Sequence, residues 1–221
     1  MLKTKPITSS SARSRFLSLV QKHSLPGVAV KRGRLIWDQL ESSYGEPHRH
    51  YHTLAHVLEC LDELDGCGAQ VQCPHEIEMA LWFHDVIYAV GGRENERLSK
   101  ELFQRCFRDV WSSDSVARIE QLIAVTDHSQ QPMDNDQRFM CDIDLASFGK
   151  AWPAFLKDSE ALVQESPHLD PDQYVRNKLA FLDGLNGRRR IYYTEHFQIK
   201  YEAVARDNIA RYSRMLKQSS S

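Results

Sequence analysis

The sequence predicts an all-α fold, a helical bundle. Apolar residues recur at spacings of three and four along several segments, which is the period of one buried face of an α-helix. The strict alternation of polar and apolar residues that marks a half-buried strand is hard to find anywhere in the chain. Glycine, proline, asparagine and aspartate gather between the periodic segments, as expected of connections.

Stripes of apolar residues define the predicted helices in chain order. They run over Leu54 to Leu64, Ile77 to Tyr88, Leu98 to Val110, Ile119 to Ile123 and Phe197 to Met215. Pro74 and Ser113 stand where two of these helices should begin. The last stripe is the longest, and it predicts a long terminal helix.

Capping residues support two helices in the C-terminal third. Asp170, Pro171 and Gln173 resemble an N-cap, a first-turn proline and a capping-box partner. Thr194 is placed to cap the terminal helix. Helical punctuation therefore agrees with the periodicity.

The chain of 221 residues has the size of one generous domain, which can bury most of its apolar surface without staples. Residues 1–12 are rich in serine, threonine and lysine, and we expect a flexible N-terminus there. The single helical domain is expected over residues 13–217.

Composition narrows the class of protein. Hydrophobic residues make up 42% and charged residues 26% of the chain, values typical of a globular protein, and the net charge of -2 predicts no attraction to nucleic acid or acidic membranes. No apolar run approaches the roughly 20 residues of a membrane helix. Five cysteines without a CxxC pair, in a chain that begins without an apolar signal core, predict reduced thiols and a cytoplasmic protein.

The doublet His84 and Asp85 lies in the apolar segment ALWFHDVIY, where burying an unpaired carboxylate would be costly. A bound metal ion would remove that cost. Alternatively, His84 is a hydrogen-bonded core histidine and Asp85 faces solvent.

A histidine cluster lies upstream in RHYHTLAH. His52 and His56 are four residues apart, which places both on one face if the helix already includes them, and such a pair can ligate a metal ion. Alternatively, His50 and His52 precede the helix and only cap it or pack.

A pair of acids follows in FMCDIDLASFG. Asp142 and Asp144 are two residues apart beside apolar residues, where we expect a helix to start. Either acid could ligate a metal ion, or both could simply complement the dipole of that helix.

The order of a histidine, a His-Asp doublet and a distant aspartate resembles the metal-binding signature of the HD superfamily. The segments YHTLAHV, WFHDVIY, ENERLS and DIDLASFG look like a bacterial branch described as predicted metal-dependent HD phosphohydrolases, over roughly Trp37 to Asn208. This resemblance implies an HD-domain helical bundle with additional N- and C-terminal helices. It also implies the metal ligands His56, His84, Asp85 and Asp144, with Asp142 as the alternative to the last.

Two imidazoles and two carboxylates without a thiolate suit a divalent Mn, Fe, Co, Ni, Zn or Mg ion rather than a cysteine-rich structural zinc site. Four protein ligands on an ion that accepts six leave positions for water and a phosphate oxygen. The resemblance therefore implies a phosphohydrolase that acts on a nucleotide or another small phosphate ester through a metal-activated water.

Further residues are candidates by position. Glu96 is the candidate base that positions water, and with Asp85 it forms the predicted catalytic pair; its alternative is a solvated helix N-terminus. Asn95 and His52 are candidate substrate contacts. His128 could contact the substrate phosphate or a second metal ion, or act as a C-terminal dipole partner. In the run Arg188 to Arg190, Arg189 is the candidate phosphate contact, although such runs are often only solvated.

Two other functions remain open from the sequence. The first is an HD-scaffold di-iron oxygenase, whose extra ligands could come only from His128, His52 and Glu96. The second is a sensor that binds a nucleotide without turnover, because a fold does not determine a function. The expected partner in either hydrolytic or sensory function is a small phosphorylated molecule, and the oligomeric state is left open.

Overall fold

The computed structural model describes residues 9–25, 30–89, 91–92, 94–167 and 169–219, and within these ranges it contains helices and no strand. The all-α prediction is therefore confirmed. The α-helices are α1 (Ser9–His23), α2 (Val30–Tyr44), α3 (Leu54–Cys67), α4 (Pro74–Phe83), α5 (Asn95–Phe107), α6 (Ser113–Ala124), α7 (Asn135–Asp144), α8 (Trp152–Gln164), α9 (Pro171–Gly187) and α10 (Glu195–Ser219). Short 3₁₀ turns follow three of them: η1 (Gly68–Gln70), η2 (Val125–Asp127) and η3 (Leu145–Gly149).

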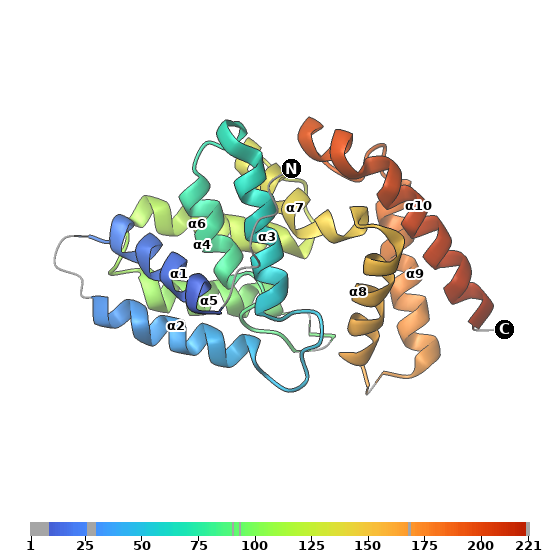
Figure 1. Cartoon of the computed structure of the whole chain (residues 1–221), viewed down its shortest axis with the longest axis horizontal. Coiled ribbons are helices and arrows are strands. Elements are labelled where there is room, and N and C mark those ends of the chain that lie inside the picture. The colour runs from blue at the N-terminus through green and yellow to red at the C-terminus, as the bar shows by residue number, and fades with distance from the viewer. Residues whose placement is uncertain (1–8, 26–29, 90, 93, 168, 220–221) are drawn as a thin grey trace.

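The helices form two groups joined through α7 and η3 (Figure 1). In the first group α1 packs on α2, and α4 packs on α3 and α6. In the second group α10 packs along α9 and α8, and it also covers η3. Because η3 follows α7 directly, it brings the second group against the end of α7.

One cluster of buried apolar side chains runs through both groups, from Ala12 in α1 to Leu216 in α10. Its largest members are aromatic. Trp82 of α4 packs edge-on against Phe16 and Trp37, with ring centroids 5.8 and 5.7 Å away. Edge-to-face contacts of this kind stabilise a core beyond the burial of their area.

The predicted caps are found with one difference. The Asp170 side chain accepts a hydrogen bond from the Gln173 amide at 3.0 Å, and Thr194 Oγ1 accepts one from the Phe197 amide at 3.4 Å. The Gln173 side chain instead donates to Asn177 at 2.7 Å, so no capping box closes. α4 and α6 begin at Pro74 and Ser113 as expected.

Two boundaries differ from those expected. α1 begins at Ser9, within the segment expected to be flexible, and Ala12 is fully buried in the core; residues 1–8 lie outside the described ranges. The helix expected over Ile77 to Tyr88 ends at Phe83, after which the Val86 amide turns back to the Phe83 carbonyl at 3.1 Å. His84 and Asp85 therefore stand at a helix end.

All five cysteines are free. Among the described helices, none combines the length and the apolar character needed to cross a bilayer.

Candidate metal centre

Imidazole and carboxylate groups from three helices meet at one point. His56 lies in the first turn of α3, His84 caps the C-terminus of α4, Asp85 follows it, and Asp144 is the last residue of α7. The Nε2 atoms of His56 and His84 are 3.3 Å apart, and Asp85 Oδ2 lies 2.9 Å from His84 Nε2. Both imidazoles are buried.

Asp144 completes the cluster. Its Oδ1 atom lies 3.3 Å from His56 Nε2 and 3.5 Å from His84 Nε2, and Asp85 Oδ2 is 3.6 Å from His56 Nε2. Ligand atoms about 2.1 Å from a shared ion lie about 3.0 Å apart at neighbouring octahedral corners and about 3.4 Å apart at tetrahedral corners. The observed separations of 2.9 to 3.6 Å are close to these values, so the donor set fits one small divalent ion.

The protonation of His84 also suits a ligand. Its Nδ1 atom lies 2.8 Å from the Leu81 carbonyl, which can only accept, so Nδ1 carries a proton and Nε2 is the atom that would bind an ion after losing its own proton. Burial alone would lower the pKa of His84, but Asp85 and Asp144 outweigh it and raise the pKa well above its ordinary value. The two carboxylates therefore stabilise a positive charge between them, and a divalent cation would supply that charge.

Cys60 is a neighbour of the cluster that the sequence analysis did not single out. Ligand atoms of His56, Cys60, His84 and Asp144 all lie within 4.8 Å of one another, a group that could hold a metal ion. The Cys60 sulfur is nearly equidistant from both nitrogens of His56, at 3.9 Å from Nδ1 and 3.7 Å from Nε2. It therefore lies beside the ring rather than along the Nε2 lone pair. Burial raises the pKa of the Cys60 thiol well above its ordinary value.

Asp142, the alternative ligand, points away from the cluster. Its carboxylate accepts hydrogen bonds from the Tyr193 amide at 2.8 Å and from the amide and hydroxyl of Thr194, each at 2.7 Å. It therefore anchors the start of α10, and burial raises its pKa to about 6. Asp142 and Asp144 end α7, so they do not complement the dipole of a helix that starts at their own position, although Asp142 contacts the start of α10.

His128 extends the cluster from η2. Its Nε2 atom lies 2.9 Å from Asp144 Oδ2, whereas its buried Nδ1 atom has no hydrogen-bond partner among the described residues. His128 is also the one non-glycine residue with a positive φ in the described part of the chain, at 55°. That left-handed backbone conformation costs a small amount of free energy. The rest of the fold must offset this cost in order to hold the His128 ring towards Asp144.

The face-sharing helix predicted for His52 and His56 is wrong, because α3 begins at Leu54 and His52 lies in the preceding turn. The buried carboxylate of Glu165, at the end of α8, holds that turn. Its Oε1 accepts the amides of His50, Tyr51 and His52, each at 2.8 Å, and its Oε2 lies 2.6 Å from His52 Nδ1. Burial would raise the pKa of Glu165, but these hydrogen bonds outweigh it and lower the pKa to about 2.

Arg49 ties this turn to the His84-Asp85 segment. Its buried guanidinium donates to the carbonyls of His52 at 3.1 Å, Asp85 at 2.6 Å and Val86 at 3.0 Å. The ring centroid of Tyr44 lies 5.3 Å from the guanidinium carbon. Arg49 therefore fixes the backbone on both sides of the cluster.

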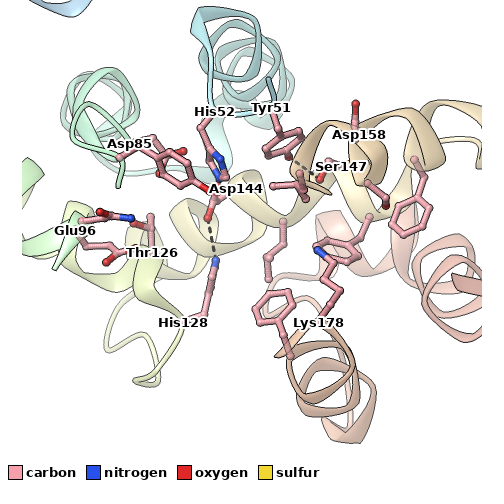
Figure 2. A pocket seen from close by; sticks show the side chains of 18 residues that line it. Tyr51, His52, Asp85, Glu96, Thr126, His128, Asp144, Ser147, Asp158 and Lys178 are labelled. Atoms are coloured by element: carbon pink, nitrogen blue, oxygen red, sulfur yellow. Dashed lines mark hydrogen bonds and ion pairs between the residues drawn. The ribbon is translucent and has the colours of Figure 1, made fainter. Parts of the chain in front are cut away.

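A cavity of about 240 Å³ opens beside the cluster. Asp85, Asp144 and His128 line one end of it, together with His52 and Glu96 (Figure 2). The opposite end is formed by η3, α8 and α9. A ligand in this cavity would meet the donor cluster at one end only.

Two further predicted contacts, Glu96 and Asn95, border the cavity. Burial raises the pKa of Glu96, its own main-chain hydrogen bond partly opposes this effect, and the negative charge of Asp85 raises the pKa further, so the pKa is raised overall. Asn95 also borders the cavity, but its side chain both accepts from and donates to the main chain of Ala89, at 2.9 and 3.0 Å, so it closes the loop before α5.

Arg189 is not among the residues that line the cavity, so its role as a phosphate contact stays a prediction from the sequence. The carbonyls of Arg188 and Arg189 accept hydrogen bonds from Arg206 of α10, which pins the segment and leaves the Arg189 side chain exposed. Arg188 instead donates to the His128 carbonyl at 3.4 Å.

Compared with protein-family profiles, curated proteins and solved structures, the chain matches none.

Proposed function

We propose that the protein is a metal-dependent phosphohydrolase of the HD superfamily that acts on a small phosphate ester, including nucleotides. The observation that carries the proposal is the meeting of His56, His84, Asp85 and Asp144 at one end of a cavity. A divalent ion held by these groups would polarise a phosphoryl oxygen and lower the pKa of a water molecule. The proposed membership of the HD superfamily rests on the order of the sequence motifs and on the residues within them.

The chain supplies the remaining groups for hydrolysis. Water adds to phosphorus, the bond from phosphorus to the ester oxygen breaks, and the leaving oxygen takes a proton. Glu96, which lines the cavity on the same side as Asp85, is placed to orient the water and accept its proton. His52, whose Nδ1 atom faces Glu165, lines the cavity and would offer its Nε2 atom to a phosphoryl oxygen, whereas His128, whose Nε2 atom faces Asp144, would orient that carboxylate.

The test compares wild type with Asp85→Ala, and with Asp109→Ala as an exposed control after α5. Each protein is stripped with chelator and reloaded with Mn, Co, Ni, Zn or Mg. Metal content is measured by elemental analysis, and phosphate release is measured from nucleotides and simple phosphomonoesters. We expect Asp85→Ala to lose the bound metal and the phosphate release, with unchanged helix content by circular dichroism. We expect Asp109→Ala to retain the metal and the activity.

Other outcomes would replace the proposal. Two irons per chain with consumption of dioxygen would favour the oxygenase, with His128 as an added ligand. Tight nucleotide binding without phosphate release would favour the sensor. A full metal content in Asp85→Ala would contradict the ligand assignment itself.

A further inference from the structure

The end of the cavity opposite the donor cluster is lined by aromatic rings. Phe148 of η3 lies 5.8 Å from Phe155 of α8 and 6.2 Å from Phe181 of α9, measured between ring centroids. Leu162 of α8 lines the cavity beside them. An apolar wall of this kind binds a carbon framework or a planar ring, and it offers little to a bare phosphate ion.

Lys178 of α9 lies within this apolar wall (Figure 2). Its Nζ atom is 5.9 Å from the centroid of Phe148 and 5.7 Å from that of Phe181. These ring faces provide a modest cation–π attraction, worth about 0.5–2 kcal/mol in proteins. In the described part of the chain no carboxylate pairs with Lys178, and Asp158, the acid of α8 that also lines the cavity, instead binds Lys150 at 2.6 Å.

Desolvation accordingly lowers the pKa of Lys178 from 10.5 to about 8. Near neutral pH the side chain is therefore still mainly charged. The other titratable groups that line the cavity are Asp85, Glu96, Asp144, His52 and His128, which Figure 2 shows across the cavity from Lys178, together with Asp158, Tyr51 and Tyr88. An unpaired cation in an apolar wall lacks a partner that an anionic ligand could provide.

We propose that Lys178 and the Phe148–Phe181 wall form a second binding subsite, which takes an anionic group attached to an apolar or aromatic body. This inference rests on the proposed function for the other end of the cavity. Together the two ends select a small phosphate ester whose carbon framework carries a second anion, such as a carboxylate. The volume of about 240 Å³ is below the roughly 300–1,000 Å³ of pockets for drug-sized ligands, which favours a small substrate.

The first experiment tests the subsite without metal or turnover. Chelator-treated wild type is titrated by calorimetry with benzoate and with benzyl alcohol, which has a similar shape and no charge. We expect benzoate to bind about tenfold or more tightly than benzyl alcohol, because a charge-assisted hydrogen bond contributes about 1.5–3 kcal/mol. Lys178→Met should abolish that preference, and Lys22→Met, an exposed lysine of α1, should retain it.

The second experiment connects the subsite to substrate choice. With the reloaded protein, kcat/KM is compared for 4-carboxyphenyl phosphate and phenyl phosphate. We expect wild type to favour the carboxylated ester about tenfold or more, and Lys178→Met to treat both alike. Lys178→Gln provides a second neutral variant if Lys178→Met does not fold.

The two proposals fail in different ways. Equal binding of benzoate by wild type and the folded neutral variants would overturn the subsite, whatever the activity. Lysine-dependent benzoate binding without phosphate release from either ester would support the subsite and contradict the proposed hydrolysis. Asp85→Ala, which should lose activity, is expected to bind benzoate as wild type does.

Discussion

Glu165→Gln is expected to destabilise the protein, although it only replaces one carboxylate oxygen by an NH₂ group. Glu165 is distant in sequence from the residues of the cluster. The wild-type carboxylate accepts three main-chain amides and also lies 2.6 Å from His52 Nδ1. The single side-chain oxygen of glutamine can accept either from the three main-chain amides or from His52. The NH₂ group that replaces the second oxygen cannot accept from the remaining donor. The fold therefore loses a charged acceptor at a site where the Glu165 side chain has no exposed surface.

The magnitude follows from the pKa of Glu165. Its decrease from 4.5 to about 2 corresponds to about 3 kcal/mol of preference for the ionised group in the folded state. We expect a loss of about 2–3 kcal/mol near pH 7, because glutamine retains part of the hydrogen bonding. For a chain of this size that loss lowers the melting temperature by about 4–12 °C.

The sign of the pH dependence is set by the same shift. A carboxyl with a lowered pKa contributes its full stability above its unfolded pKa of 4.5 and loses it as the pH falls towards 2. The difference between wild type and Glu165→Gln should therefore decrease by about 1.4 kcal/mol between pH 7 and pH 3.5. Urea unfolding at both pH values measures it.

Glu160→Gln is the matched control, because Glu160 is exposed on the same helix. It should change the free energy of unfolding by less than about 0.5 kcal/mol at either pH. If Glu165→Gln behaves like this control, or if its effect does not depend on pH, the assignment of Glu165 as the anchor of the His50–His52 turn is wrong.

The remaining predictions concern the neighbours of the cluster and the second subsite. Arg49→Met should lower the free energy of unfolding by about 2–4 kcal/mol and weaken metal retention, because three carbonyls lose their donor; unchanged urea unfolding and metal content would contradict this. Cys60→Ala should leave the metal content of the reloaded protein unchanged, since its sulfur lies beside the His56 ring; loss of the ion by elemental analysis would make Cys60 a ligand. The affinity for benzoate should be nearly full at pH 7, about half of that at pH 8, and lower by about tenfold or more at pH 9.5, because the charged form of Lys178 binds the anion and its pKa is about 8; calorimetry in wild type showing no such decrease would exclude Lys178 as the contact.

Local sequence predicted part of the fold, namely α3 to α6, α9 and α10, whereas no pattern was assigned to α1, α2 or α8, and α7 ends where a helix was expected to start. Apolar spacing located α3, α5, α6 and α10, and capping residues located the starts of α9 and α10, because both signals act within one or two turns. The C-terminus of α4 was missed. The residues after Phe83 continue the apolar pattern, so only the turn between Phe83 and Val86 marks the helix end.

The site was predictable only in part from local patterns. The His84-Asp85 doublet was the most informative signal, because a carboxylate in an apolar segment needs a partner if it is buried. Cys60 carried a signal that could have been used, since it lies four residues after His56 and on the same helical face. Arg49 adjoins the histidine cluster, but its contacts are to carbonyls, which no sequence pattern marks.

By itself, the sequence determined an all-helical chain and a set of residues suited to a metal ion. Tertiary structure decided which of two nearby acids meets the histidines: Asp142 and Asp144 are two residues apart on α7, so they point to different sides of the helix. It also brought Glu165 to His52, 113 residues away, and Lys178 into the cavity. Such choices depend on how α8 and α9 pack against the other helices, and packing over long separations leaves no periodic signal in the chain.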